Sequence, residues 1–374
     1  MTFYAPFCIP FIVGAALMFA VLLWKWGTWL YRLPRADKML ILKGIPTRRT
    51  LEALGEVVSE SLLHRRIFRV NPLLGYMHMS LAFGWFLLIA VGWLETLSYL
   101  GLRWVPLQGH VFFKYFATGL EHKPFFDFVM DLLLLFVLSG VALAWGKRFY
   151  SKAMGMRRTT HHVLGDRVAL SALWFIFPAR LVAESVTSAI YGGGGFLTGG
   201  LGSWLAAHVE MLTLMTLESV AWWFYSSCLG VFFVALPFSR YMHIFTEIPL
   251  IFLRRYRLRS TEKESSYDHF QVEACSRCGI CIDPCQLQSV LGINDVQSVY
   301  FLRDRRYHTL RPRPTTASCA AAASRSAPWT STSIRCGSTR ATRCATCPTS
   351  GATATSRGLT ARRARARWAT SPAA

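Results

Sequence analysis

Five long apolar stretches dominate the chain, and each is long enough to cross a lipid bilayer, which takes about 20 helical residues. They cover residues 7–31, 74–97, 125–145, 168–190 and 217–237. No basic residue precedes the first stretch, so it lacks the charged start of a signal peptide and we expect it to be retained. The pattern predicts an all-α membrane protein with a bundle of five transmembrane helices.

The composition agrees with this prediction. Hydrophobic residues make up 53% of the chain and charged residues 16%, and the mean hydropathy is +0.32. A soluble globular chain carries about 25% charged residues. The composition therefore excludes a soluble enzyme and indicates that most of the chain lies in a lipid bilayer.

The net charge of +21 reflects topology more than nucleic-acid binding. Lys and Arg number nine in 32–72 and six in 147–167, against three in 98–124 and none in the Gly-rich loop 191–203. Because cytoplasmic loops retain positive charge, the N-terminus is expected outside and the C-terminal region in the cytoplasm. Within the first basic segment, residues 47–63 predict an interfacial helix. No nucleic-acid partner is expected.

The most specific motif is a run of four cysteines: Cys275, Cys278, Cys281 and Cys285. Their C-x₂-C-x₂-C-x₃-C spacing is the bacterial ferredoxin run, so it predicts a [4Fe-4S] cluster. A zinc site is the alternative, although structural zinc usually uses two separated pairs of ligands. Disulfides are disfavoured on the cytoplasmic side. The chain as written contains no second run downstream.

The last sixty residues have a different composition. Residues 313–374 contain ten arginines but no Asp, Glu or Lys, and nothing in them could build a core. The cysteine spacing is repeated by four alanines, Ala317, Ala320, Ala323 and Ala327. In a reading frame shifted by one base, the first two bases of each GCN codon, together with the base before them, could form the cysteine codon TGC. Pro328 then follows the fourth position, as it does in two-cluster ferredoxins. We expect this segment to be a frameshifted, unstructured tail, which would leave the protein truncated and could leave it inactive.

Two histidines are candidate haem ligands. His78 lies one turn into the second span and His243 at the inner end of the fifth, so both are expected at the cytoplasmic level on different helices. Two neutral imidazoles on opposing helices can hold a b-type haem with six-coordinate iron, which is suited to electron transfer. The alternative is that each is an interfacial histidine whose ring only reaches the headgroups.

Charged residues inside the spans form a second candidate site, because such charges are costly in lipid and usually functional. Arg180 and Glu184 share a face of the fourth span and are expected to pair, and Asp127 and Asp131 share a face of the third. We expect Arg180, Glu184 and Asp131 to hold a haem propionate or to carry protons for a quinone. A structural ion pair between helices is the alternative.

Four segments together carry a resemblance to a known family. They are residues 75–78 (Gly-Tyr-Met-His), residues 237–243 (Pro-Phe-Ser-Arg-Tyr-Met-His), the cysteine run and residues 295–303. The chain up to about residue 312 resembles the heterodisulfide-reductase-related membrane iron–sulfur oxidoreductases. In these, a five-span cytochrome b domain similar to the nitrate reductase gamma subunit is fused to a ferredoxin module. The resemblance implies haem b and electron exchange with menaquinone. It also implies a soluble partner, either an electron-transfer flavoprotein or a complex of disulfide or sulfur metabolism.

These expectations give three regions: a transmembrane cytochrome b domain (1–246), a cytoplasmic ferredoxin-like segment (247–312) and the tail (313–374). The expected protein is a quinone-linked oxidoreductase in the inner membrane of a bacterium. It would transfer electrons between a cytoplasmic redox partner and the menaquinone pool through the cluster and the haem. The competing hypothesis is a non-catalytic membrane anchor whose cysteines bind zinc or dock a partner.

Overall fold

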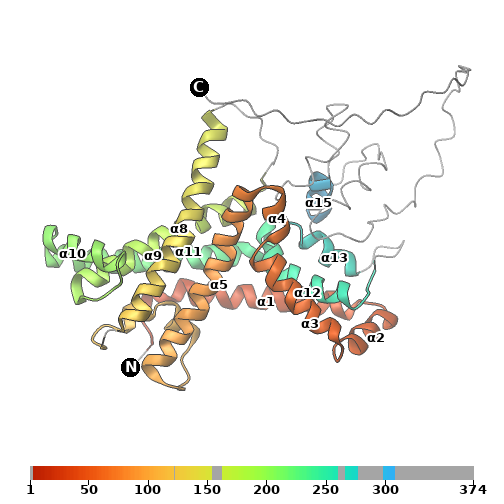
Figure 1. Ribbon diagram of the computed structural model, residues 1–374, viewed down its shortest axis with the longest axis horizontal. Helices are drawn as coiled ribbons and strands as arrows, with labels where there is room; N and C mark the ends of the chain where they lie inside the picture. The colour runs from red at the N-terminus through yellow and green to blue at the C-terminus, as the bar shows by residue number, and fades with distance from the viewer. Residues whose placement is uncertain (1–2, 122, 154–161, 260–265, 277–297, 308–374) are drawn as a thin grey trace, which may run out of the picture. The chain divides into compact units, whose positions relative to one another are not determined.

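The computed structural model describes residues 3–121, 123–153, 162–259, 266–276 and 298–307, and every element within these ranges is helical (Figure 1). Five helices in them are long and apolar enough to cross a membrane: Pro6–Tyr31, Pro72–Leu100, Pro124–Tyr150, Leu164–Tyr191 and Met211–Phe238. The prediction of a helical, multi-pass membrane protein is therefore confirmed. The helices extend beyond the apolar stretches that predicted them.

The spans consist of five long helices, two of them extended by a short 3₁₀ turn. These are η1 (Pro6–Cys8) with α1 (Ile9–Tyr31), α5 (Pro72–Leu100), α8 (Pro124–Ala153), α9 (Leu164–Tyr191), and α11 (Met211–Ala235) with η3 (Leu236–Phe238). The shorter elements are α2 (Arg35–Gly44), α3 (Arg48–Glu56), η2 (Val57–Leu62), α4 (Arg65–Val70), α6 (Leu107–Val111), α7 (Phe113–Phe116), α10 (Thr198–His208), η4 (Arg240–Met242), α12 (His243–Arg255), α13 (Ser266–Glu273) and α15 (Ser298–Arg306).

Local sequence explains where the long helices begin and end. Asn71 caps α5, because its side-chain oxygen accepts a hydrogen bond from Leu74 N at 3.0 Å, and Pro72 supplies the first helical residue. Gly101 ends α5 and Gly192 ends α9 with positive φ angles of 67° and 78°. Glycine adopts this backbone region without a steric penalty.

The spans pack in pairs through large apolar side chains and close helix contacts. α9 packs most extensively on α11, α5 on α8, and α1 on α11. Contacts between α5 and α8 join Tyr76 to Ser139 near one end and Gly92 to Met130 near the other. These two helices are therefore antiparallel, as successive membrane spans should be.

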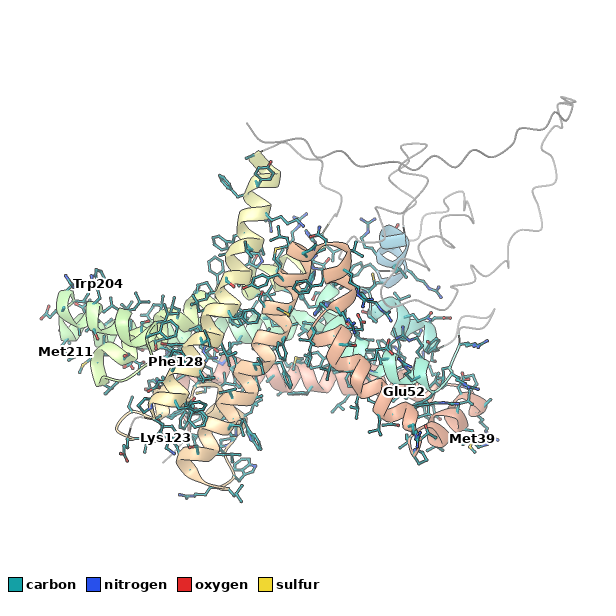
Figure 2. The ribbon with its side chains drawn as sticks, in the orientation of Figure 1. Met39, Glu52, Lys123, Phe128, Trp204 and Met211 are labelled. Atoms are coloured by element: carbon teal, nitrogen blue, oxygen red, sulfur yellow. The ribbon has the colours of Figure 1, made fainter. Side chains whose placement is uncertain are left out.

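The segment between the first two spans contains the helix that the sequence predicted for residues 47–63. α3 and the π-helical turn η2 cover most of residues 47–63. α3 packs against α12, and Arg254 and Arg255 of α12 form ion pairs with Glu56 of α3. Met39 of α2 and Glu52 of α3 mark this region in Figure 2.

The Gly-rich segment 191–203 is not a loop throughout. It is a loop only as far as Leu197, after which α10 begins and packs against α9 (Figure 1). Asp131 of α8 caps α10, because its carboxylate accepts hydrogen bonds from the backbone N–H groups of Leu197 and Thr198 at 2.7 and 2.9 Å. The cap comes from a distant part of the sequence, so local composition did not indicate a helix start.

The expected regions coincide only in part with the described elements. α12 runs through residue 246, so the expected boundary between membrane and cytoplasmic regions falls inside a helix. Cys278, Cys281 and Cys285 lie outside the described residues, as does the tail 313–374, so the ferredoxin-like segment and the tail remain predictions.

Candidate functional site

His78 lies near the start of α5, at the end of the bundle where α1 ends and α9 begins. Its ring is nearly parallel to that of His64, with an interplanar angle of 18° and 5.4 Å between ring centroids. His64 connects η2 to α4 with a φ of 50°, which is uncommon for a residue other than glycine. Its Nδ1 lies 3.1 Å from the Leu62 carbonyl oxygen. This end of the bundle is called the histidine end below.

His243 begins α12 at the same end of the bundle. Its Nδ1 lies 2.7 Å from the Arg240 carbonyl oxygen, so the Nδ1–H tautomer can donate there and leave Nε2 as an acceptor. The surrounding protein lowers the pKa of His243 to about 3, chiefly through burial, and the proximity of His78 contributes in the same direction. His243 is therefore neutral near pH 7.

The turn that presents His243 is held by a residue that the sequence did not single out. Asp166, fully buried at the start of α9, accepts a hydrogen bond from Arg240 N at 2.7 Å. The same carboxylate oxygen accepts a hydrogen bond from the Tyr307 hydroxyl at 3.0 Å. Asp166 thus joins the fourth span to the turn before His243 and to the end of α15.

The first cysteine of the run lies beside the same cluster. Arg306 of α15 donates hydrogen bonds to the carbonyl oxygens of Val272, Glu273 and Cys275 at 2.8, 2.7 and 3.1 Å. Its guanidinium group is also close enough to His243 to contribute to the lowered pKa of that imidazole. Arg306 is therefore hydrogen-bonded to the start of the cysteine run and lies within electrostatic range of a candidate haem ligand.

The donor chemistry of the histidine end fits a haem. A metal-binding histidine usually donates its other ring N–H to a carbonyl or carboxylate oxygen, and His243, one of the two candidate ligands, has Nδ1 beside a backbone carbonyl. His78 and His243 come from different helices, as a haem clamp requires. Among the described residues, no three His, Cys, Asp or Glu side chains are arranged to bind a metal ion directly.

The charged residues of the spans meet at the opposite end of the bundle, where α5 ends and α8 begins. Arg180 Nε lies 2.9 Å from Glu184 Oε1, which confirms the predicted pair. The Tyr225 hydroxyl on α11 lies close to Arg180. Lys114 of α7 forms an ion pair with Asp127 of α8.

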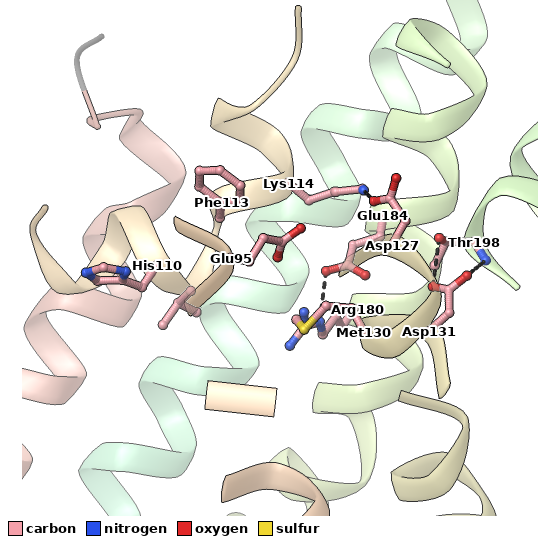
Figure 3. Close-up of a pocket in the computed structure, with 11 residues that line it drawn as sticks. Glu95, His110, Phe113, Lys114, Asp127, Met130, Asp131, Arg180, Glu184 and Thr198 are labelled. Carbon is pink, nitrogen blue, oxygen red and sulfur yellow. Dashed lines mark hydrogen bonds and ion pairs between the residues drawn. The ribbon is translucent and has the colours of Figure 1, made fainter. Parts of the chain in front are cut away.

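These groups surround a cavity of about 20 Å³, enough for roughly one water molecule (Figure 3). Asp131, Arg180 and Glu184 all line it, so the structure brings together the three span residues singled out for a quinone or proton role. Lys114 and Glu95 line it too. The sequence offered little indication of them, since Lys114 lies in a connecting segment and Glu95 is a single acid near the end of a span.

The structure thus divides the candidate residues between two ends. His78 and His243 lie at the histidine end with Cys275, while Asp131, Arg180 and Glu184 lie around the cavity at the other end. His64, Asp166 and Arg306 belong to the first group but have no spacing that would have identified them.

No protein-family model matches this chain, and neither the curated proteins nor the solved structures provide a match.

Proposed function

We propose that the protein transfers electrons between a cytoplasmic redox partner and the menaquinone pool of the membrane. A [4Fe-4S] cluster on the cysteine run and a b-type haem between His78 and His243 would carry the electrons. The observation that carries this proposal is the grouping, at one end of the bundle, of two imidazoles from different helices with the start of the cysteine run, to which Arg306 is hydrogen-bonded.

Each residue at the histidine end has a defined part in this proposal. When bound, the haem supplies a one-electron carrier whose potential depends on its ligands and their surroundings. His243 is held neutral, with Nδ1 on the Arg240 carbonyl and Nε2 available as a metal ligand. Asp166 holds the Arg240 turn in place. Arg306 keeps the first cysteine beside this group, which favours short electron transfers.

The far cavity would provide the polar groups that a quinone needs. Reduction of a quinone consumes protons, and oxidation of a quinol releases them. Arg180, paired with Glu184, would bind a quinone oxygen, and the carboxyl groups that line the cavity would exchange the protons. With the basic loops in the cytoplasm, the histidine end would face the cytoplasmic partner and the cavity would face the other side of a bacterial inner membrane.

The test is the visible spectrum of the purified, dithionite-reduced protein. We expect a haem b α-band, and we expect His78→Ala and His243→Ala each to reduce haem content at least tenfold. His208→Ala is the matched control, because the Nδ1 atom of His208 also lies on a backbone carbonyl, that of Trp204 at 2.8 Å, but in α10. His64→Ala should retain the band.

Metal analysis of the same samples distinguishes the competing hypothesis. Iron together with acid-labile sulfide supports the cluster on Cys275, Cys278, Cys281 and Cys285. Zinc without haem would contradict the proposal and support a non-catalytic membrane anchor. Loss of the α-band in His208→Ala, or its retention in either His78→Ala or His243→Ala, would exclude the proposed ligand pair.

A further inference from the structure

The cavity at the end of the bundle opposite His78 contains more carboxyl groups than positive charges. Its lining includes the cations Lys114 and Arg180, and the carboxyl groups Asp127, Glu184, Asp131 and Glu95. Within an apolar bundle, an uncompensated charge is costly, so the partner of each carboxyl group determines which of them stays ionised.

Three of the four carboxylates have a partner that stabilises a negative charge. Asp127 pairs with Lys114, and Glu184 pairs with Arg180. Asp131 accepts two backbone N–H bonds at the start of α10 and a third hydrogen bond, at 2.8 Å, from the Thr198 hydroxyl. The positive end of the α10 dipole adds to this stabilisation.

Glu95 is the remaining carboxyl group. Its residue is only 5% exposed, yet within the described part of the chain it makes no hydrogen bond and no ion pair. In Figure 3 its carboxyl group points into the space between Lys114 and Arg180. Both cations attract it, but each already has a closer carboxylate partner, and Glu184 and Asp127 repel it.

A second titratable group lies on the same cavity. His110 of α6 lines it, and its Nδ1 is buried without a hydrogen-bond partner among the described residues. The His110 ring is only partly buried, and burial lowers its pKa, so it is neutral near pH 7 and can accept or donate a proton. Tyr99 of α5 also lies near Glu95, with its hydroxyl accepting a hydrogen bond from Lys123 N at 2.9 Å.

We propose that Glu95 is the proton-binding group of this cavity, and that it exchanges its proton with the side of the membrane reached by the α5–α8 connection. The proton resides on the Glu95 carboxyl group. With Glu95 neutral, the two cations balance their two ion-paired carboxylates, and the charge of Asp131 is stabilised by its hydrogen bonds at the start of α10. A water molecule in the cavity, with His110 at its rim, provides the path to the surface. This proposal goes beyond haem and cluster binding and does not depend on either.

Carbodiimide labelling tests the proposal without an activity assay. N,N′-dicyclohexylcarbodiimide reacts with protonated carboxyl groups in apolar surroundings and forms a stable adduct that peptide mass spectrometry can locate. In membranes at pH 7, we expect the adduct on Glu95 and not on Asp127, Asp131 or Glu184. No adduct on Glu95, or equal labelling of Glu184, would overturn the proposal.

Two variants test the charge balance itself. Glu184→Gln leaves Arg180 without its carboxylate partner, so Glu95 should ionise and its labelling should fall several-fold at pH 7. Glu218→Gln is the matched control. Glu218 of α11 is also a buried acid in a span, but it accepts its hydrogen bond from the Thr187 hydroxyl of α9. An unchanged level of Glu95 labelling in Glu184→Gln would refute the proposed balance.

The direction of exchange needs sealed vesicles with a different pH on each side. Labelling of Glu95 should decrease when the pH is raised in the compartment that contacts the α5–α8 connection, and should not respond to the other compartment. The opposite response would place the exchange path at the histidine end. Failure of haem binding would leave all of these outcomes unchanged, so this proposal and the proposed function can fail separately.

Discussion

Glu56 and Glu247 show how strongly the partner of a buried acid controls its charge. Both are buried and lie where α3 and η2 meet α12. Burial raises the pKa of Glu56, but the nearby guanidinium groups of Arg254 and Arg255 lower it further, so the net pKa is below the ordinary value. Among the described residues, Glu247 accepts a single hydrogen bond, from the Ser61 hydroxyl at 2.5 Å, and burial raises its pKa to about 8.

This difference predicts the pH dependence of stability. Between pH 4.5 and about 8 the unfolded chain ionises Glu247 while the folded protein keeps its proton, so the free energy of unfolding should fall as the pH rises. Glu247→Gln should remove this loss and stabilise the protein by on the order of 1–3 kcal/mol at pH 8.5, with little effect near pH 5. The thermal unfolding midpoint in detergent, measured at pH 5 and at pH 8.5, tests both expectations. Glu56→Gln is the control and should destabilise the protein at pH 8.5; a lower midpoint for Glu247→Gln there would contradict the prediction.

At the scale of single residues, the sequence predicted pairs that are close along one helix and missed those that depend on the fold. Arg180 and Glu184 are four residues apart on one apolar helix, so their pairing could be expected. Contacts such as Asp166 with Arg240 N and Asp131 with Thr198 join different helices. His64 lies beside His78, and the positive φ of His64 between η2 and α4 could not be read from the sequence.

At the scale of helices, the contact between α1 and α11 depends on two glycines. A Cβ added at Gly14 would lie 2.6 Å from Gly230 Cα, closer than real Cβ contacts allow. Small residues let membrane helices approach closely, which strengthens van der Waals packing where the hydrophobic effect contributes little. Phe11 N also donates to Ser226 Oγ at 3.3 Å along this contact.

A pair of glycines in the same helix tests the contribution of this packing. Gly14→Ala should destabilise the protein by about 1–3 kcal/mol, because backbone atoms of α11 would have to move. Gly27→Ala is the control, since a Cβ at Gly27 meets no atom within 4 Å and alanine favours a helix interior. The thermal unfolding midpoint of each variant in detergent is the measurement. Equal midpoints for the two variants would show that α1 and α11 are not closely packed at Gly14.

The helices themselves were largely predictable from hydrophobic pattern, whereas α10 was not. Each of the five apolar stretches is part of a helix, because a span in lipid must satisfy its backbone hydrogen bonds internally. α10 starts in a glycine-rich sequence, which normally disfavours a helix. Its first turn depends on the Asp131 carboxylate of another helix, which no local pattern reveals.

At the scale of the whole bundle, alternating helix directions separate two kinds of chemistry. The proposed ligands His78 and His243 and the first cysteine lie at one end, and the Glu95 cavity lies at the other. An electron path at one surface and a proton path at the other would suit a quinone enzyme. The assignment of each end to a side of the membrane comes from the distribution of basic residues, and it can be tested directly.

Introduced cysteines measure that orientation. Leu102→Cys lies in the α5–α8 connection, where Leu102 is 96% exposed, and Met39→Cys lies on α2, where Met39 is 50% exposed. Since 32–72 carries nine basic residues and 98–124 only three, we expect α2 in the cytoplasm. A membrane-impermeant maleimide should label Leu102→Cys in intact cells several-fold above the unmodified chain. It should label Met39→Cys only after permeabilisation. The reverse pattern would place His243 and the cysteine run on the outer surface, away from any cytoplasmic electron donor, and the proposed electron path would then be excluded even if haem binds.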